Sequence, residues 1–354
     1  MSAFTKYKAM ELPRSVVVGH DALNEVPSVC KQLRTGSPAL LIFDGITRRV
    51  AGERVRALLS DAGFDTIEVE IADASEQEIL RAQEAVREAK AALVLGIGGG
   101  RPIDVAKCAS FREGVPFISV PTAASHDGIV SFKASITGKD GRKVSLAART
   151  PLAVIADTSV IASAPHRLLA AGCGDIISNS TAVMDWELAA RLRNEYYSSY
   201  AASLSRMTAQ LMIEHARTIK PGLEESAWFV VKALVSSGVA MSIAGSSRPA
   251  SGSEHKFSHA LDMIAKRPGL HGEQCGIGTI MMMYLHGGDW EGIRRALREV
   301  GAPITAKEVG VESEEIVEAL VRAHEINPER YTILGDKGLT QDAAERVARI
   351  TKVI

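Results

Sequence analysis

The chain has 354 residues, of which 46% are hydrophobic, and this is enough to build two domains around a large core. With 41 basic and 42 acidic residues the net charge is −1, so the composition gives no reason to expect nucleic acid or an anionic membrane as a partner. We expect a cytoplasmic protein without membrane insertion, because no apolar run reaches the ~20 residues of a membrane span, no signal peptide is evident, and the four cysteines show no C-x-x-C spacing.

Strands and helices alternate over roughly the first 160 residues, a pattern typical of a mostly parallel sheet flanked by helices. We expect strands at residues 15–19, 39–43, 66–71, 91–95, 116–120 and 152–156. The helices expected between them cover residues 21–33, 47–62, 75–89 and 103–111. Residues 131–137 and 142–148 flank a Gly-Lys-Asp-Gly sequence, which predicts a β-hairpin.

Strand patterns nearly vanish after about residue 160, and helical patterns replace them. The expected helices cover residues 168–179, 181–195, 198–218, 226–244, 253–265, 276–286 and 290–300, followed by a charged helical tail from residue 306. The sequence therefore predicts an α/β domain over residues 1–160 and an all-helical domain over residues 161–354. A ligand of the first domain would lie in the cleft between the two.

Gly98, Gly99 and Gly100 form a turn between an apolar strand and an expected helix. Glycine lets the backbone turn sharply and lets a ligand approach closely. Pro102 suits the first helical position, where its missing N–H group would have had no partner. Free N–H groups and the positive end of the helix dipole would then meet at one point, which predicts a phosphate or pyrophosphate site. Arg101 stands where the dinucleotide fingerprint G-x-G-x-x-G has its last glycine, so we expect a variant of that site.

Asp44 follows the expected strand at residues 39–43. A carboxylate at the carboxyl end of a strand can accept a hydrogen bond from an adenosine ribose hydroxyl. It can equally cap the next helix, and the sequence leaves both interpretations open.

The hydroxyl-rich loop PTAASHDG follows the expected strand at residues 116–120, where a sheet delivers its loops to a cleft. Thr122 and Ser125 could hold phosphate or amide groups of a cofactor, and Asp127 could hold a substrate hydroxyl. The alternative is an ordinary turn with side-chain caps.

The helical half contains a group of potential metal ligands. His255 and His259 lie four residues apart, so one helix face would present both imidazoles. Asp175 lies in another expected helix, and His271 lies just before a third. Two imidazoles and a carboxylate suit a zinc-like ion with one position open for substrate. The alternatives are a packing pair of histidines and a helix cap at Asp175. Cys275, one turn after His271, is either a rival soft ligand or a buried inert thiol.

Five motifs carry a resemblance to a known family. In chain order they read GIGGGRPIDVAK, PTAASHDG, GCGD, SSRPASGSEHKFSHALD and LHGEQ. Together they resemble the archaeal-type glycerol-1-phosphate dehydrogenases, which belong to a superfamily with the iron-dependent alcohol dehydrogenases, the glycerol dehydrogenases and the dehydroquinate synthases. The resemblance covers nearly the whole chain. It implies a Rossmann-like dinucleotide-binding domain followed by an all-helical metal- and substrate-binding domain of the dehydroquinate synthase type.

The same resemblance implies a role for each matching position. The backbone from Gly98 to Asp104 would hold the pyrophosphate of NAD(P)H, with Gly99, Gly100, Arg101 and Pro102 within it, and Thr122, Ser125 and Ser131 would contact the cofactor. One Zn²⁺ would be bound by Asp175, His255 and His271. Asp127 would contact the substrate, and His259 would be a substrate or proton-relay residue rather than a ligand. His126 stands where a smaller polar residue is expected.

The reaction implied is the reversible reduction of dihydroxyacetone phosphate to sn-glycerol 1-phosphate, the backbone of archaeal ether lipids, by a homo-oligomeric enzyme. Zinc would polarise the carbonyl, and Asp127 or His259 would serve the proton transfer. We expect Arg248 to bind the substrate phosphate, because the glycerol dehydrogenases lack this stretch. The competing interpretations are a glycerol or polyol dehydrogenase, a dehydroquinate synthase-like lyase and a nucleotide-binding regulator without catalysis.

Overall fold

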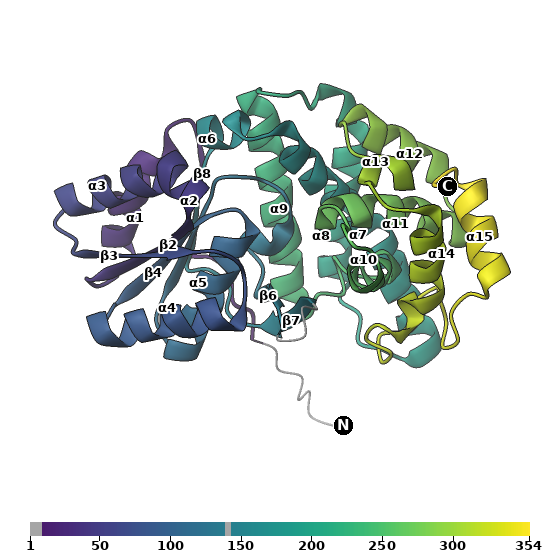
Figure 1. Cartoon of the computed structure of the whole chain (residues 1–354), viewed down its shortest axis with the longest axis horizontal. Coiled ribbons are helices and arrows are strands. Elements are labelled where there is room, and N and C mark those ends of the chain that lie inside the picture. The colour runs from purple at the N-terminus through teal and green to yellow at the C-terminus, as the bar shows by residue number, and fades with distance from the viewer. Residues whose placement is uncertain (1–8, 139–142) are drawn as a thin grey trace, which may run out of the picture.

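The molecule has an α/β half and a helical half, which lie side by side along its longest axis (Figure 1). The structure is a computed structural model, and it describes residues 9–138 and 143–354. The turn of the expected hairpin therefore lies outside the described residues.

A parallel six-stranded sheet forms the centre of the α/β half, as predicted. The strand order is β1-β8-β5-β4-β2-β3, and every pair in the sheet is parallel. The strands are β1 (Ser15–Gly19), β2 (Ala39–Asp44), β3 (Thr66–Ile71), β4 (Leu93–Gly98), β5 (Phe117–Pro121) and β8 (Ala153–Asp157). Strands β4, β5 and β8 are buried along their whole length, as expected for parallel strands covered on both faces.

Helices cover both faces of this sheet (Figure 1). Successive side chains of a strand point to opposite faces. Leu40 and Ile42 of β2 therefore pack with α4 (Glu76–Ala89) and α5 (Gly100–Glu113). Leu41 and Phe43 pack on the other face with α1 (Val26–Gln32) and α3 (Glu53–Asp61). The helix expected at residues 47–62 is divided into α2 (Gly45–Thr47), a π-helical turn (Arg48–Gly52) and α3.

The expected hairpin is present as the antiparallel strands β6 (Lys133–Thr137) and β7 (Lys143–Ala147). Two buried side chains of α5 hold it in place. The ammonium group of Lys107 donates to the carbonyl oxygens of Gly128 and Lys133, at 2.7 and 2.6 Å. A carboxylate oxygen of Asp104 accepts from the backbone N–H of Ser135 at 3.1 Å. These contacts fix the start of the hairpin beside the N-terminal part of α5.

The described residues beyond β8 form helices and loops, as predicted for the second half. The helices expected at 168–179 and 181–195 are one continuous helix, because the hydroxyls of Ser178 and Ser180 bond to carbonyls of the preceding turn and do not interrupt it. The domain boundary at residue 160 stays a prediction. The helices are α6 (Thr158–Ser163), α7 (His166–Arg193), α8 (Ser199–Glu214), α9 (Glu224–Ala244), α10 (Ser253–Ile264), α11 (His271–Leu285), α12 (Trp290–Glu299), α13 (Ala306–Val309), α14 (Ser313–Arg322) and α15 (Gln341–Ile350).

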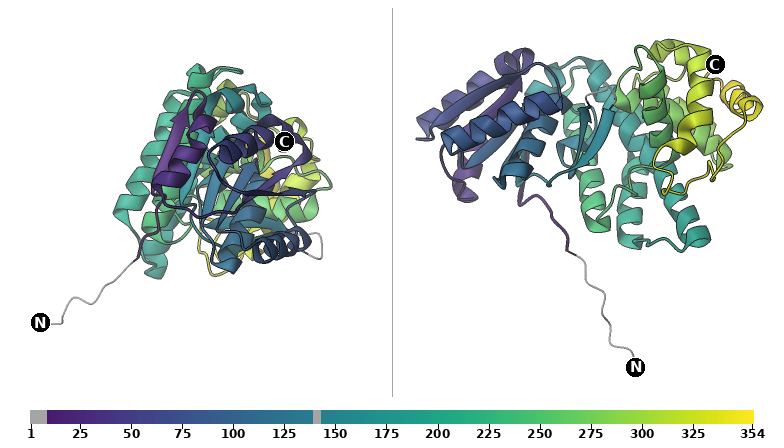
Figure 2. Two further views of the ribbon diagram at one scale, coloured as in Figure 1. Left: turned by 90° about the vertical axis from the view of Figure 1, so that its left-hand side faces the viewer. Right: turned by 60° about the horizontal axis from the view of Figure 1, so that its bottom comes forward.

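Helix α9 is long and apolar enough, by length and composition, to cross a membrane, although Lys232 and several serines interrupt its apolar residues. More than half of its most apolar window is nevertheless buried inside the protein. It packs against α6, α7 and α8 and runs along the sheet edge formed by β1 (Figure 2). Its apolar composition is therefore accounted for by its place in the core.

Candidate active site

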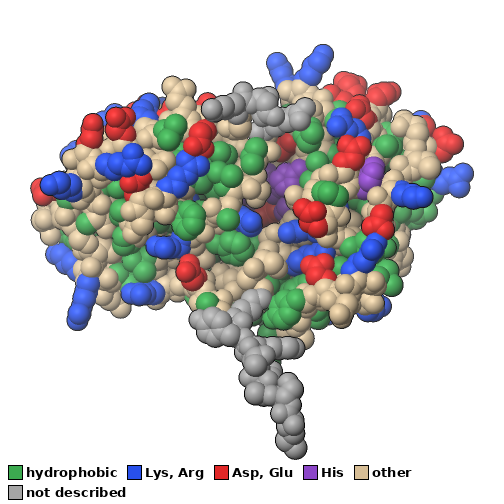
Figure 3. Space-filling model, turned by 90° about the horizontal axis from the view of Figure 1, so that it is seen from below, with side chains coloured by type: hydrophobic (Ala, Val, Ile, Leu, Met, Phe, Trp, Pro, Cys, Tyr) green, Lys and Arg blue, Asp and Glu red, His purple; other side chains and the backbone are tan. Residues whose placement is uncertain are grey.

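A cavity of about 760 Å³ lies between the two halves of the molecule. On one side it is lined by the loops at the carboxyl ends of β2, β4 and β5 and by the hairpin. On the other side it is lined by residues of α10 and of the start of α11. Figure 3 shows histidine side chains, coloured purple, in the hollow between the halves. The position matches the general rule that open parallel sheets bind ligands beyond the carboxyl ends of their strands.

The glycine turn after β4 leads directly into α5, whose first N–H groups have no partner within the helix. Gly98 has a φ of +155°, and a Cβ at Gly100 would lie 2.5 Å from the Nε2 of His126, so both positions require glycine. Helix α5 begins at Gly100, ahead of the expected residues 103–111, so Pro102 is its third residue instead of its first and still lies in the first turn. The cavity is lined by the predicted residues Gly99, Gly100, Arg101, Pro102 and Asp104.

Asp44 has the capping role that the sequence left open. Its Oδ1 accepts hydrogen bonds from the backbone N–H groups of Ile46 and Thr47, at 3.0 and 2.9 Å. Its other oxygen, Oδ2, lies 3.3 Å from the guanidinium of Arg101, and Asp44 itself lines the cavity. A capping role does not exclude a contact with a ribose hydroxyl, which stays a prediction.

The loop after β5 connects the glycine turn to the helical half. Three predicted cofactor contacts line the cavity, namely Thr122, Ser125 and Ser131. A cofactor bound in the cavity could therefore reach them. His126 packs against the glycine turn, and its Nδ1 accepts from the N–H of Gly128 at 2.9 Å. Burial lowers the pKa of His126, so this side chain is neutral at neutral pH. His126, which differs from the residue type expected at this position, therefore stabilises the turn by packing against it.

Asp127 lies at the junction of the two halves. Its backbone N–H donates to Oδ2 of Asp175 at 2.8 Å, and its own carboxylate accepts from the hydroxyl of Ser237 at 2.9 Å. The loop that carries the predicted cofactor contacts is thus hydrogen-bonded to a predicted metal ligand.

The predicted metal ligands converge in the helical half. Asp175 on α7, His255 on α10 and His271 on α11 lie with Cys275 in a group whose ligand atoms are all within 4.8 Å of one another. Oδ1 of Asp175 is 3.7 Å from Nε2 of each histidine. Burial and the neighbouring Asp127 raise the pKa of Asp175 to about 7, so the ionised carboxylate needs a cation beside it. One carboxylate and two imidazoles at these distances suit zinc.

The spacing of the histidines left either His255 or His259 as a ligand, and the geometry places only His255 in the metal group. His259 lies one turn further along α10, with its ring centroid 6.0 Å from that of His271. It lines the cavity, and burial lowers its pKa to about 4, so it carries no charge at neutral pH. Cys275 is buried on α11 and has a thiol pKa raised by burial to about 11, which favours the protonated form over a thiolate ligand.

A buried carboxylate that the sequence analysis did not single out orients His255. Oε1 of Glu254 accepts from Nδ1 of His255 at 3.0 Å and from the N–H of Gly252 at 2.6 Å. Its Oε2 accepts from the hydroxyl of Thr181 at 2.7 Å. With the proton on Nδ1, Nε2 of His255 has a free lone pair directed toward Asp175.

A second chain of hydrogen bonds orients His271 in the same way. Its Nδ1 lies 3.2 Å from the hydroxyl oxygen of Ser258, and that hydroxyl donates to Oε1 of Gln274 at 2.5 Å. The amide of Gln274 is in turn fixed by Asp262 at 2.9 Å. Nδ1 of His271 is therefore the donor, and its Nε2 is left for a metal ion. The signal for Glu254 and Gln274 was their place beside the ligands, in the motifs GSEH and LHGEQ.

The structure argues against Arg248 as a ligand of the substrate phosphate. Its side chain is only 3% exposed and does not line the cavity. The guanidinium is paired with the carboxylate of Glu195, with an Nε–Oε1 distance of 2.6 Å, and donates to the carbonyl oxygen of Tyr331 at 2.9 Å. The charge of Arg248 is thus neutralised by a partner within the fold, which a sequence pattern cannot reveal.

The comparisons with known proteins agree with this geometry. Residues 17–165 match the family described as iron-containing alcohol dehydrogenase. The chain is 61% identical to the glycerol-1-phosphate dehydrogenase [NAD(P)+] of Methanosarcina mazei, with 98% of this chain and 97% of that protein covered. It is 55% identical to the enzyme of the same name from Methanothermobacter thermautotrophicus, with 98% and 99% covered. Among solved structures, the glycerol dehydrogenase of Schizosaccharomyces pombe has the same fold, with a TM-score of 0.83, 21% identity, and 98% of this chain and 91% of that chain covered.

Proposed function

This chain belongs to the family of the glycerol-1-phosphate dehydrogenases [NAD(P)+], and we propose that it reduces dihydroxyacetone phosphate reversibly to sn-glycerol 1-phosphate with NADH or NADPH. The observation that carries the proposal is the convergence of Asp175, His255 and His271 at a cavity whose opposite wall is the N-terminus of α5. A redox reaction at a carbonyl needs a hydride donor and an electrophile on the two sides of one substrate. The cavity offers a place for both.

The α/β half would bind the dinucleotide. The free N–H groups at the start of α5 are suited to the pyrophosphate, and the hydroxyls of Thr122, Ser125 and Ser131 line the route from that helix toward the helical half. We assign dinucleotide binding to residues 1–160 and metal and substrate binding to residues 161–354.

When bound, zinc at Asp175, His255 and His271 would supply Lewis-acid polarisation of the substrate carbonyl, and the nicotinamide would supply the hydride. The protein side chains orient the substrate and handle the proton. Asp127 is held by Ser237 through one carboxylate oxygen, so its other oxygen can accept a substrate hydroxyl. His259 is neutral and lines the same cavity, so it can relay a proton: one ring nitrogen takes up a proton from solvent while the other gives its proton to the substrate oxygen.

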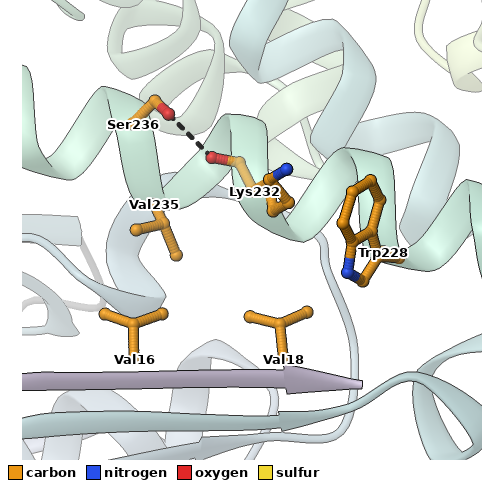
Figure 4. A pocket seen from close by; sticks show the side chains of 6 residues that line it. All are labelled: Val16, Val18, Trp228, Lys232, Val235 and Ser236. Carbon is orange, nitrogen blue, oxygen red and sulfur yellow. Dashed lines mark hydrogen bonds between the residues drawn. The ribbon is translucent and has the colours of Figure 1, made fainter. Parts of the chain in front are cut away.

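We also propose that the chain acts in the cytoplasm, as a homo-oligomer, in the synthesis of ether-lipid backbones. The four cysteines are free and buried, which suits a reducing compartment. A shallow groove lies between the edge strand β1 and helix α9, where Val16 and Val18 face Val235 and Trp228 (Figure 4). An edge strand beside apolar side chains is a surface that a second copy of the chain can cover, and sedimentation of the purified protein tests this.

The test of the proposed function is the oxidation of reduced nicotinamide with dihydroxyacetone phosphate, before and after treatment with a chelator, together with a chiral assay of the product. We expect turnover that is lost on chelation, restored by Zn²⁺, and yields the sn-1 phosphate. Equal turnover of glycerol and glycerol 1-phosphate in the oxidative direction would instead favour a polyol dehydrogenase. Binding of the dinucleotide without turnover of any of these substrates would contradict both.

A further inference from the structure

Basic side chains around the cavity differ in whether a carboxylate balances their charge. Four pairs among the described residues balance such a charge. They are Arg101 with Asp44, Lys107 with Asp104, Lys143 with Asp262, and the buried Arg248 with Glu195.

Two others have no carboxylate partner in the part of the chain that the structure describes. Lys133, at the start of β6, lines the cavity, and its ammonium group lies 5.7 Å from the ring centroid of its neighbour Phe132. Arg330 lies in the loop between α14 and α15 and donates to the hydroxyl of Ser247 at 2.8 Å and to the carbonyl of Ser251 at 2.6 Å. Both serines line the same cavity, so the guanidinium lies directly behind its wall.

The charge of Arg330 acts on Lys133. Burial and then the charge of Arg330 lower the pKa of Lys133, and burial lowers the pKa of Arg330 to about 10. Neither cation forms an ion pair within the described residues, although the more distant carboxylates of Glu195, Glu254 and Asp185 act on Arg330. An anion that binds between Lys133 and Arg330 would therefore be stabilised by both. Lys133 belongs to the α/β half and Arg330 to the helical half, so an anion at this point would also hold the two halves together.

The loop that carries Arg330 is built to hold it in place. Arg248 donates to the carbonyl oxygen of Tyr331, and the backbone N–H of Ile333 donates to the buried carboxylate of Asp185 at 2.7 Å. The arginine first expected to bind the phosphate therefore supports the loop of a second arginine. The hydroxyl of Ser247 accepts from Arg330, which leaves its hydrogen free for an acceptor in the cavity.

We propose that the phosphate group of the substrate binds between Lys133 and Arg330, with the hydroxyl of Ser247 as a further donor. The proposal rests on the proposed reduction of a phosphorylated ketone, and it names the residues that distinguish this substrate from its unphosphorylated analogue. A phosphate dianion accepts charge-assisted hydrogen bonds from both cations, which are about twice as strong as neutral ones.

The experiment compares Lys133→Gln and Arg330→Gln with the wild type, each loaded with Zn²⁺, on dihydroxyacetone phosphate and on dihydroxyacetone. We expect kcat/KM for the phosphorylated substrate to fall by about 10- to 100-fold in each variant, mainly through KM. For dihydroxyacetone the change should stay within about threefold, because that substrate has no group for these cations to bind. Inorganic phosphate should inhibit the wild type competitively and both variants much more weakly.

The matched control is Lys307→Gln on α13, which removes one exposed lysine charge that does not line the cavity. It should leave both substrates unaffected. Arg330→Lys keeps the charge and should recover part of the loss. Calorimetry of inorganic phosphate binding to each protein gives a readout independent of turnover.

Each outcome has a distinct meaning. A wild type that does not reduce dihydroxyacetone phosphate overturns the proposed function itself. A wild type that does so, with variants that keep its KM and phosphate affinity, overturns the phosphate site alone. An equal loss on both substrates also overturns it, because the two residues would then act only on the fold.

Discussion

Glu254→Gln should weaken zinc binding without unfolding the site. Glutamine has the shape of glutamate and can keep the acceptor oxygen that faces His255 and Gly252. Its amide would then face the hydroxyl of Thr181, which can turn to donate to the carbonyl of Ser178 at 3.1 Å and accept from the amide. The variant therefore removes the negative charge behind His255 while the hydrogen bonds remain.

The magnitude follows from what the carboxylate does. It raises the basicity of His255 and stabilises the positive charge of the ion through the imidazole. Loss of such a partner costs about 10- to 100-fold in metal affinity, or about 1.4 to 2.7 kcal/mol. Glu254→Ala should be more severe, because three donors in a fully buried position would lose their acceptor.

The assay is competition for Zn²⁺ with a chromophoric chelator, accompanied by thermal unfolding of the metal-free proteins. The matched control is Glu273→Gln, which neutralises another buried glutamate two residues from His271 that pairs with Arg167 instead. The control should lose stability but keep its zinc affinity within about threefold. An unchanged zinc affinity in Glu254→Gln would refute the reasoning, and so would an equal loss of affinity in the control.

Three further predictions concern the metal, the glycine turn and the buried arginine. Asp175→Asn should abolish zinc binding and turnover while NADH binding persists, because the carboxylate is the only anion in the predicted ligand set. The zinc content of the purified variant and a fluorescence titration with NADH test this. Gly100→Ala should destabilise the fold by about 1 to 3 kcal/mol and raise the KM for NADH, because its Cβ would lie 2.5 Å from the ring of His126; retention of both wild-type values would contradict it. Arg248→Met should lower the free energy of unfolding in urea by about 2 to 4 kcal/mol, because Glu195 and the carbonyl of Tyr331 lose a buried partner. An unchanged midpoint of the urea unfolding curve would show that the ion pair contributes nothing.

Much of the fold could be predicted from the sequence because its signals are local. Each strand of the sheet is a short apolar run between turn residues, and the change from strand to helix patterns after β8 is visible without a structure. Local signals also misled. We expected two helices that meet near position 180, whereas α7 is continuous there and the hydroxyls of Ser178 and Ser180 bond within it. The start of α11 at His271 was missed because glycines follow it.

The candidate site was predictable only in part. The glycine turn and the histidine spacing are contained in single segments, so their chemistry could be named from the sequence. The partners of charged groups are not local. Arg248 is 53 residues from Glu195, and Arg330 is 83 residues from Ser247, so no pattern could tell which arginine is paired with a carboxylate and which contacts residues of the cavity wall. Glu254 stands beside His255 in the sequence, but only the structure shows that its carboxylate accepts from Nδ1 of that histidine.

The central claim is that one divalent ion is held by a carboxylate and two imidazoles from three helices of the second half. X-ray absorption spectroscopy of the zinc-loaded protein tests it most directly, because sulfur and nitrogen ligands differ in distance from zinc by about 0.2 to 0.3 Å. We expect a shell of nitrogen and oxygen only, with the scattering of two imidazoles, and a loss of one imidazole in His255→Ala and in His271→Ala. A sulfur ligand from Cys275, or an imidazole count that falls in His259→Ala but not in His255→Ala, would contradict the account.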